Sequence, residues 1–142
     1  GHGLIAALAA GPDVVKIGRV EAVEAGVVAA QASADEAATA LVGSGARLAV
    51  ITDVASEVAA ADASTVWRAT VPRVDAVNAV GSGDSFNAAM SLALMDGADV
   101  AAARRRGVAA GSANALTISA ASIDPDVVRA LEDDVHVTEE RR

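Results

Sequence analysis

A glycine turn that leads directly into a helix, residues 80–86 (VGSGDSF), constrains this sequence more than any other feature. Glycine adopts left-handed backbone conformations that other residues avoid, so Gly81 and Gly83 allow a tight reversal at this point. The first N–H groups of a helix have no acceptor within the helix and carry partial positive charge. The turn is therefore suited to binding an anion, most often a phosphate group.

An acidic residue, Asp84, stands in the first turn of that helix, where a resting carboxylate would repel a phosphate. The position is useful if the carboxylate takes a proton from a hydroxyl while nearby N–H groups stabilise charge on a transferring phosphoryl group. That combination suits phosphoryl transfer to an alcohol. The alternative is a plain glycine turn in which Asp84 only stabilises the helix N-terminus, and the residues alone leave both interpretations open.

Two other motifs with a glycine turn do not fit this stretch. A serine-hydrolase elbow needs glycines two residues before and two after the serine, and Ser82 has Val80 and Asp84 there. A Walker A loop needs a lysine followed by serine or threonine, and no such pair follows the turn.

Three consecutive arginines at residues 104–106 could clamp a phosphate. Consecutive helical residues point in different directions, so they cannot all face one ligand. We therefore expect the run to be the solvated face of a helix.

Composition excludes several classes of protein. The formal net charge of −8 over 142 residues argues against nucleic acid or an anionic membrane as a partner. The chain has no cysteine for disulfides or thiolate metal sites, and no apolar run reaches the roughly 18 residues of a membrane helix. No secretory signal leads the chain, so we expect a cytoplasmic protein. The chain starts within a helical pattern and without methionine, which predicts a fragment.

Hydrophobic patterning predicts alternating helices and strands, and hence an α/β layered fold. A capping box at residues 33–36 opens one helix, Asp124 followed by Pro125 opens another, and residues 48–52 form a buried strand. The expected helices cover residues 4–10, 21–28, 34–42, 100–116, the stretch from the glycine turn to Gly97, and the stretch after Asp124. The expected strands cover residues 14–17, 48–52, 58–61, 65–69 and 135–137, with residues 139–142 frayed.

Four blocks of the sequence resemble the PfkB (ribokinase-like) sugar kinases and follow that family's order. Residues 78–88 (NAVGSGDSFNA) resemble its second signature, and residues 109–116 (AAGSANAL) resemble the helix that closes over the nucleotide. Residues 15–22 (VKIGRVEA) lie where the family often has Lys-Pro-Asn-x-x-Glu, and residues 51–53 lie where it has a Thr-Leu-Gly strand end. The first two blocks are most similar to the 1-phosphofructokinase and tagatose-6-phosphate kinase branch. The resemblance spans essentially the whole chain but only the C-terminal half of such an enzyme.

The resemblance implies the C-terminal part of a ribokinase-like three-layer α/β/α domain, a Rossmann-like sheet with helices on both faces. Residues 1–142 would be a partial domain that holds the nucleotide-binding and catalytic half and lacks the sugar-binding half and the lid. The implied activity is that of a carbohydrate kinase, which uses ATP and Mg²⁺ to phosphorylate a hydroxyl of a sugar or sugar phosphate. The implied partners are these small molecules, with no nucleic acid or membrane, and a homodimer is an assembly that the resemblance allows. The alternative is a truncated or noncatalytic nucleotide-binding remnant with no activity alone.

The family's roles carry over to the glycine turn residue by residue. Asp84 would be the general base that takes the proton from the sugar hydroxyl. Gly81, Ser82 and Gly83, together with the amide of Asp84, would form the anion hole.

Three further roles lie outside the turn. Glu21 would help to order the network of magnesium, phosphate and water. Thr52 and Asn114 would lie near the nucleotide.

Four positions depart from the family pattern. Gly18 replaces the usual asparagine before Glu21, which removes one ligand-ordering amide. Val54 and Glu57 replace glycines, and Val54 is expected to crowd the nucleotide. Asn78 replaces the aspartate of relatives with a potassium site, so we do not expect a monovalent-cation site.

Overall fold

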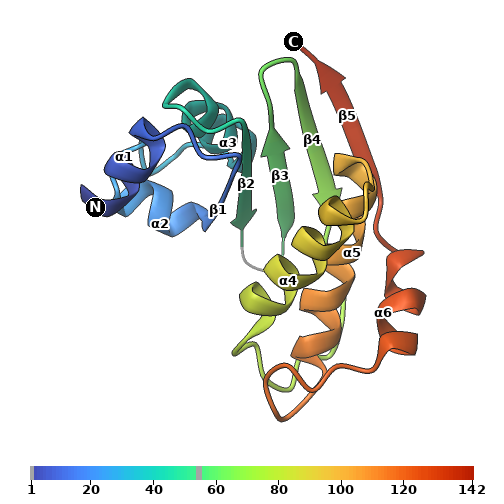
Figure 1. The fold of residues 1–142 in the computed structure, drawn as a ribbon. Coiled ribbons are helices and arrows are strands. Elements are labelled where there is room, and N and C mark those ends of the chain that lie inside the picture. Colours follow the sequence, from blue (N-terminus) through green and yellow to red (C-terminus); the bar gives the residue numbers. More distant parts are fainter. Residues whose placement is uncertain (1, 54–55) are drawn as a thin grey trace. The chain divides into compact units, whose positions relative to one another are not determined.

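The computed structural model describes residues 2–53 and 56–142, apart from the side chain of His2. The chain divides into two compact units. The first contains residues Gly1–Arg68 and Thr138–Arg142, and the second contains residues Ala69–Val137. Figure 1 labels the helices and strands.

The first unit is built on a mixed β-sheet. Its strands are β1 (Val14–Gly18), β2 (Leu48–Asp53), β3 (Glu57–Ala61), β4 (Thr65–Thr70) and β5 (Val137–Arg141). They lie in the order β1-β2-β3-β4-β5. Strand β1 runs parallel to β2, and β2 runs antiparallel to β3. Three helices accompany these strands, namely α1 (His2–Ala9), α2 (Arg19–Glu24) and α3 (Ala34–Gly43).

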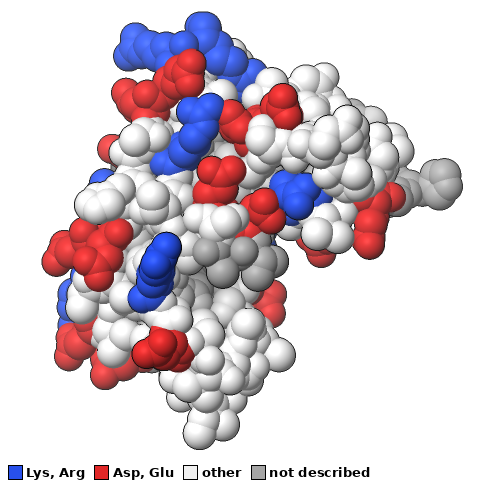
Figure 2. Space-filling model, turned by 180° about the vertical axis from the view of Figure 1, so that it is seen from behind, with Lys and Arg blue, Asp and Glu red and all other residues white. Residues whose placement is uncertain are grey.

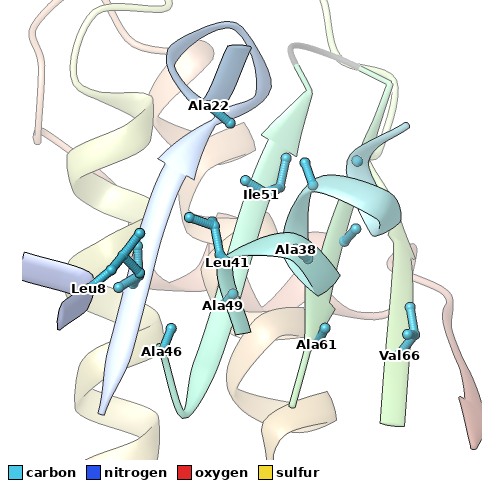
Figure 3. Packing of buried hydrophobic residues seen from close by; sticks show 13 residues of the cluster. Leu8, Ala22, Ala38, Leu41, Ala46, Ala49, Ile51, Ala61 and Val66 are labelled. Carbon is cyan, nitrogen blue, oxygen red and sulfur yellow. The ribbon is translucent and has the colours of Figure 1, made fainter. Parts of the chain in front are cut away.

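The core of the first unit lies between its helices and the sheet, and it consists largely of alanine. Helix α3 packs on β2 and β3, and Figure 3 shows Ala38 and Leu41 of α3 beside Ile51 of β2 and Ala61 of β3. All four side chains are fully buried. Small side chains let the helix lie close to the sheet, and the larger Leu41 and Ile51 fill the remaining space.

The capping box predicted for α3 is confirmed. The backbone N–H of Ser33 donates to Glu36 Oε2 over 2.8 Å, and the N–H of Glu36 donates to Ser33 Oγ over 3.4 Å. The same hydroxyl and the ion pair with Arg68 of β4 lower the pKa of Asp35, although burial opposes them. Arg68 also pairs with Glu140 of β5 over 3.2 Å, so one guanidinium connects α3, β4 and β5.

The second unit is dominated by helices α4 (Ser82–Met95), α5 (Val100–Ala115) and α6 (Pro125–Glu132). Helix α5 packs against both α4 and α6. A Cβ atom at Gly107 would lie 3.1 Å from Cε2 of Phe86, and one at Gly111 would lie 3.1 Å from the carbonyl oxygen of Ser82. The two glycines therefore allow α4 and α5 to approach closely.

The α/β class is confirmed, but several boundaries differ from expectation. The strand expected at residues 135–137 is instead β5, Val137–Arg141, and the helices expected from residues 4 and 21 begin at His2 and Arg19. Helix α2 ends at Glu24 instead of continuing to residue 28, because Gly26 has a φ of +73° and interrupts it. Residues 139–142 are not frayed, since strand β5 extends to Arg141 and the N–H of Arg142 donates to the carbonyl of Ser64 over 2.8 Å. Among the described residues no helix has both the length and the apolar character needed to cross a membrane.

Leu41 gives a direct test of the alanine-rich core. Leu41→Ala removes the fully buried isobutyl group that fills the space under α3, so it should lower the free energy of unfolding by about 2–5 kcal/mol. Ile5→Ala removes a side chain of similar size that is 55% exposed and should cost about 1 kcal/mol or less. Urea denaturation followed by circular dichroism measures both changes, and equal losses would contradict this account of the core.

Candidate active site

The glycine turn lies in the second unit and opens helix α4. Gly81 is the N-cap residue, with a φ of +84° and a ψ of −3°, which is the left-handed region. A Cβ atom there would lie only 2.8 Å from the Cβ of Ala120, so the position excludes side chains for two reasons. We call Gly81, Ser82, Gly83 and Asp84 the anion cradle.

The cradle offers hydrogen-bond donors next to a carboxylate. The first intrahelical bond runs from the N–H of Ser85 to the N-cap carbonyl over 2.9 Å, and the N–H of Ser82 donates to the carbonyl of Ala79 over 3.2 Å. The N–H groups of Gly83 and Asp84 have no acceptor among the residues that the structure describes. The side chain of Asp84 is exposed. A bound anion could therefore accept from two backbone donors while the carboxylate remains accessible to a second ligand.

The side chain of Asn114 is fully buried at the end of α5 and forms hydrogen bonds with the cradle and with residues next to the cradle in the chain. Its Nδ2 donates to the carbonyl of Val80 over 2.9 Å and to Ser82 Oγ over 3.2 Å. Its Oδ1 accepts from the N–H of Ala121 over 2.7 Å and from Ser85 Oγ over 3.3 Å. The family resemblance implies that Asn114 lies near the nucleotide. In the structure both polar atoms of its side chain form hydrogen bonds with other residues of the protein.

Two other predicted site residues, Glu21 and Thr52, both lie beside Gly18 in the first unit, at the carboxyl ends of the parallel strands β1 and β2. Gly18 ends β1 directly opposite Thr52 of β2. The N–H of Gly18 donates to Glu21 Oε2 over 2.6 Å, so the Glu21 carboxylate caps its own helix α2. The carboxyl edge of parallel strands is where α/β proteins usually bind ligands.

An ion pair at the same edge is not predicted from the sequence. Arg19 Nε lies 2.9 Å from Asp53 Oδ2, and Arg19 also donates to the carbonyl of Ala30 over 3.2 Å. Arg19 follows the end of β1 and Asp53 is the last residue of β2, and only the β1–β2 register brings them together.

The residues that depart from the family pattern fall into separate places. Glu57 begins β3 opposite Asp53. Asn78 donates to the carbonyl of Ile118 over 2.9 Å and accepts from the N–H of Val80 over 3.0 Å. Val54, which we expect to crowd the nucleotide, lies outside the described residues.

The expectation that the arginine run forms a solvated helix face is wrong for Arg104. Its side chain is fully buried in α5, and this desolvation lowers its pKa to about 10. Arg105 Nε donates to the carbonyl of Val135 over 3.3 Å, and Arg106 Nε lies 2.7 Å from Glu132 Oε1 of α6. The sequence pattern does not predict the burial of Arg104 because α5 packs against both α4 and α6, so the three arginines face different neighbours.

Charge is distributed over the surface without a dedicated metal cluster in the described ranges. Figure 2 shows acidic and basic side chains intermixed on the face that it presents. Among the ion pairs of the first unit, Arg68 pairs with both Asp35 and Glu140. Across residues 2–53 and 56–142 no group of three or more histidine, aspartate or glutamate side chains is placed to hold a metal ion.

Comparison with models of protein families identifies the family to which the chain belongs. The model of the pfkB family carbohydrate kinases matches residues 2–126. The chain therefore belongs to the pfkB family of carbohydrate kinases. No curated protein sequence matches it.

Solved structures support the same fold. A Staphylococcus aureus protein provisionally assigned as a phosphofructokinase has a TM-score of 0.87 and 22% identity, over 99% of this chain and 46% of that one. Phosphofructokinase-2 from Escherichia coli, solved in complex with potassium, has a TM-score of 0.84 and 29% identity, over 94% of this chain and 45% of that one. The same enzyme in complex with fructose-6-phosphate has a TM-score of 0.78 at 29% identity, over 94% of this chain and 44% of that one. Ribokinase from Thermotoga maritima has a TM-score of 0.75 and 21% identity, over 85% of this chain and 42% of that one.

These matches confirm the predicted fold class, a mixed α/β sheet with flanking helices that corresponds to part of a ribokinase-like fold. The chain spans less than half the length of each of these solved relatives.

The left-handed conformation of Gly81 can be separated from its crowding by a matched pair of substitutions. Gly97 lies just after the end of α4 and has a φ of +86°. A Cβ added there would meet no neighbouring atom within 4 Å, whereas a Cβ at Gly81 meets Ala120. Gly97→Ala should cost about 1–2 kcal/mol of unfolding free energy from the backbone alone. Gly81→Ala should cost a further 1–3 kcal/mol or so because the new methyl group must displace Ala120. Denaturant unfolding of both variants measures the difference, and equal costs would show that Ala120 gives way freely.

Proposed function

We propose that this chain carries the nucleotide-binding and catalytic part of an ATP-dependent carbohydrate kinase. In the proposed reaction Asp84 takes the proton from a sugar hydroxyl, and the hydroxyl oxygen forms a bond to the γ-phosphorus of ATP. The bond from that phosphorus to the bridging oxygen breaks, and ADP leaves with the electron pair. The products are ADP, the phosphorylated sugar and a proton on the Asp84 carboxyl group.

The observation that carries this proposal is the position of Asp84 in the cradle. Its exposed carboxylate stands in the first turn of α4, beside the N–H groups of Gly83 and its own backbone. The same short segment thus supplies a base for the acceptor and donors for the phosphoryl oxygens, which gain charge during transfer. Membership of the pfkB family supports ATP as the phosphoryl donor.

We propose a hexose phosphate as the acceptor, with an activity like that of the 1-phosphofructokinases and tagatose-6-phosphate kinases. The complex of Escherichia coli phosphofructokinase-2 with fructose-6-phosphate, a structure of a protein 29% identical to this chain, supports this choice.

Magnesium fits the proposed site in an indirect role. Mg²⁺ prefers oxygen ligands, keeps several waters and is bound mainly through substrate phosphates with one or two carboxylates. Glu21 supplies such a carboxylate at the carboxyl edge of β1 and β2, and its Oε2 already accepts from Gly18. We propose that Glu21 contacts the ion through water and that Thr52, which pairs with Gly18, lies near the nucleotide. When bound, the ion would neutralise charge on the phosphate groups.

We further propose that residues 1–142 are a partial kinase domain and that the other half supplies most of the sugar site. The short span relative to the solved relatives supports this, as does strand β1, which lies at the edge of the sheet with β2 as its neighbour. An edge strand presents unpaired N–H and C=O groups, to which a further strand can bind. The alternative is a noncatalytic nucleotide-binding remnant, which the glycine at position 18 favours.

Titration of the 142-residue chain with MgATP in a calorimeter tests the nucleotide site that both possibilities require. Saturable binding of one nucleotide is expected if the groups present in this chain are sufficient for binding. Gly18→Asn is the matched variant because it restores the family's amide. Its Cβ would lie 3.3 Å from Glu21 Oε2, so the Glu21 carboxylate must shift slightly to accommodate it. This variant should raise the affinity by about threefold or more if a missing amide weakens the site. Absence of binding by either form, in a folded chain, would contradict a nucleotide site within this chain.

Asp84→Asn tests the general base. In the full-length protein this change should lower kcat by about 10²–10⁴-fold, because the amide cannot accept the hydroxyl proton. MgATP binding should persist, since the backbone donors remain. Asp96→Asn, which removes an exposed carboxylate at the opposite end of α4, is the control and should leave turnover unchanged. Near-normal turnover of the Asp84 variant in a coupled ADP assay would rule out the assignment.

A further inference from the structure

We propose that Asn114 is a positioning residue that sets the geometry of the anion cradle, and that it makes no contact with the nucleotide. This inference rests on the proposed function, because it concerns how the same cradle is held in a productive conformation. It replaces the role that the sequence resemblance gives to Asn114.

The hydrogen-bonding capacity of Asn114 is used up inside the protein. A carboxamide has two N–H donors and an oxygen with two lone pairs. The two donors serve Val80 and Ser82, and the oxygen accepts from Ser85 and Ala121. The side chain is also fully buried, so a ligand could reach it only by displacing one of these four partners.

The partners of Asn114 require an amide and fix which way it points. The carbonyl of Val80 can only accept a hydrogen bond, and the backbone N–H of Ala121 can only donate one. The NH₂ group must therefore face Val80 at 2.9 Å, and the oxygen must face Ala121 at 2.7 Å. Aspartate at this position would place an oxygen against the Val80 carbonyl, and an apolar residue would leave both backbone groups without a partner.

The two backbone segments that Asn114 connects are both in unusual conformations. Gly81, which follows Val80, has a φ of +84°, and Ala121 has a φ of +61° although it is not glycine. Glycine adopts such a conformation readily, whereas for a residue such as Ala121 it persists only where the surrounding structure enforces it. Asn114 Oδ1 would lie 3.5 Å from a Cβ at Gly81 and binds Ala121 directly, so one side chain restrains both segments.

This restraint determines where the functional groups of the cradle point. The N–H groups of Gly83 and Asp84 and the Asp84 carboxylate follow within four residues of Val80. If the Val80 carbonyl and the Ser82 hydroxyl are released, the start of α4 can move relative to α5, and the donors lose their common direction. Small errors in such alignment reduce turnover more than they reduce binding.

Amide hydrogen exchange in the ligand-free 142-residue chain tests the restraint. The informative variant is Asn114→Asp, which keeps the shape but removes both N–H donors, and the control is Asn87→Asp, which adds the same charge at an exposed position of α4. Exchange of the hydrogen-bonded amides within residues 79–86 and 117–122, such as those of Ser82, Ser85 and Ala121, should rise by about tenfold or more in the Asn114 variant. Strands β1 and β2 and the control should stay unchanged. Unchanged exchange in both segments would overturn the proposal.

A milder variant keeps the test decisive if Asn114→Asp unfolds the chain. Ser85→Ala removes only the 3.3 Å bond to Asn114 Oδ1 and leaves the backbone bonds in place. It should raise exchange in the same two segments by about twofold to fivefold. If exchange in both segments stays unchanged in the Ser85→Ala variant, the proposal is overturned.

Kinetics of the full-length protein then distinguish positioning from direct binding. Asn114→Asp should lower kcat by about 100-fold or more while KM for MgATP stays within about threefold, because the donors are misaligned and not lost. A raised KM with unchanged kcat would overturn the proposal, since it would identify Asn114 as a ligand of the nucleotide. Failure of the proposed function would be seen separately, as normal turnover in the Asp84→Asn variant. The hydrogen-exchange result does not depend on whether the proposed function is correct.

Discussion

The cradle depends on how closely α4 and α5 pack. Gly107 lies against Phe86 and Gly111 lies against the carbonyl of Ser82, at distances that leave no room for a methyl group without movement. This contact brings the end of α5 within hydrogen-bonding distance of the turn, so that Asn114 can reach it. A wider helix pair would leave the turn without its buried partner, and the left-handed conformation of Ala121 would then have to persist unsupported.

Local features of the sequence predicted much of this architecture. The turn at residues 80–86, the capping box at Ser33 and the Asp124–Pro125 helix start are each fixed by interactions within a few residues. The same holds for β2, whose continuous apolar run requires burial on both faces. These signals are strong because one backbone conformation satisfies them wherever the rest of the chain lies.

The features that sequence reasoning missed depend on contacts between distant segments. Strand β5 is strongly polar and looks like a frayed end, yet Arg142 bonds to Ser64, which is far away in the chain. The pairing of Arg19 with Asp53 follows from the register of β1 and β2, and the burial of Arg104 follows from the helices that pack against α5. For the candidate site, the family pattern drew attention to Asn114, but only its four partners indicate what the amide does.

The alanine-rich core of the first unit has a consequence for how this sequence can change over time. Ala22, Ala37, Ala38, Ala49 and Ala59 are completely inaccessible to solvent. Random substitution at such positions nearly always adds volume, so the prevailing damage is steric overlap and not the voids that follow from trimming large side chains. Only glycine and serine are close in size, and both bring costs of their own. In a saturation-mutagenesis library of this unit, folded variants with substitutions at the smallest buried residues should therefore be the rarest. Substitutions that accumulate over evolution should be found mainly on the helix surfaces.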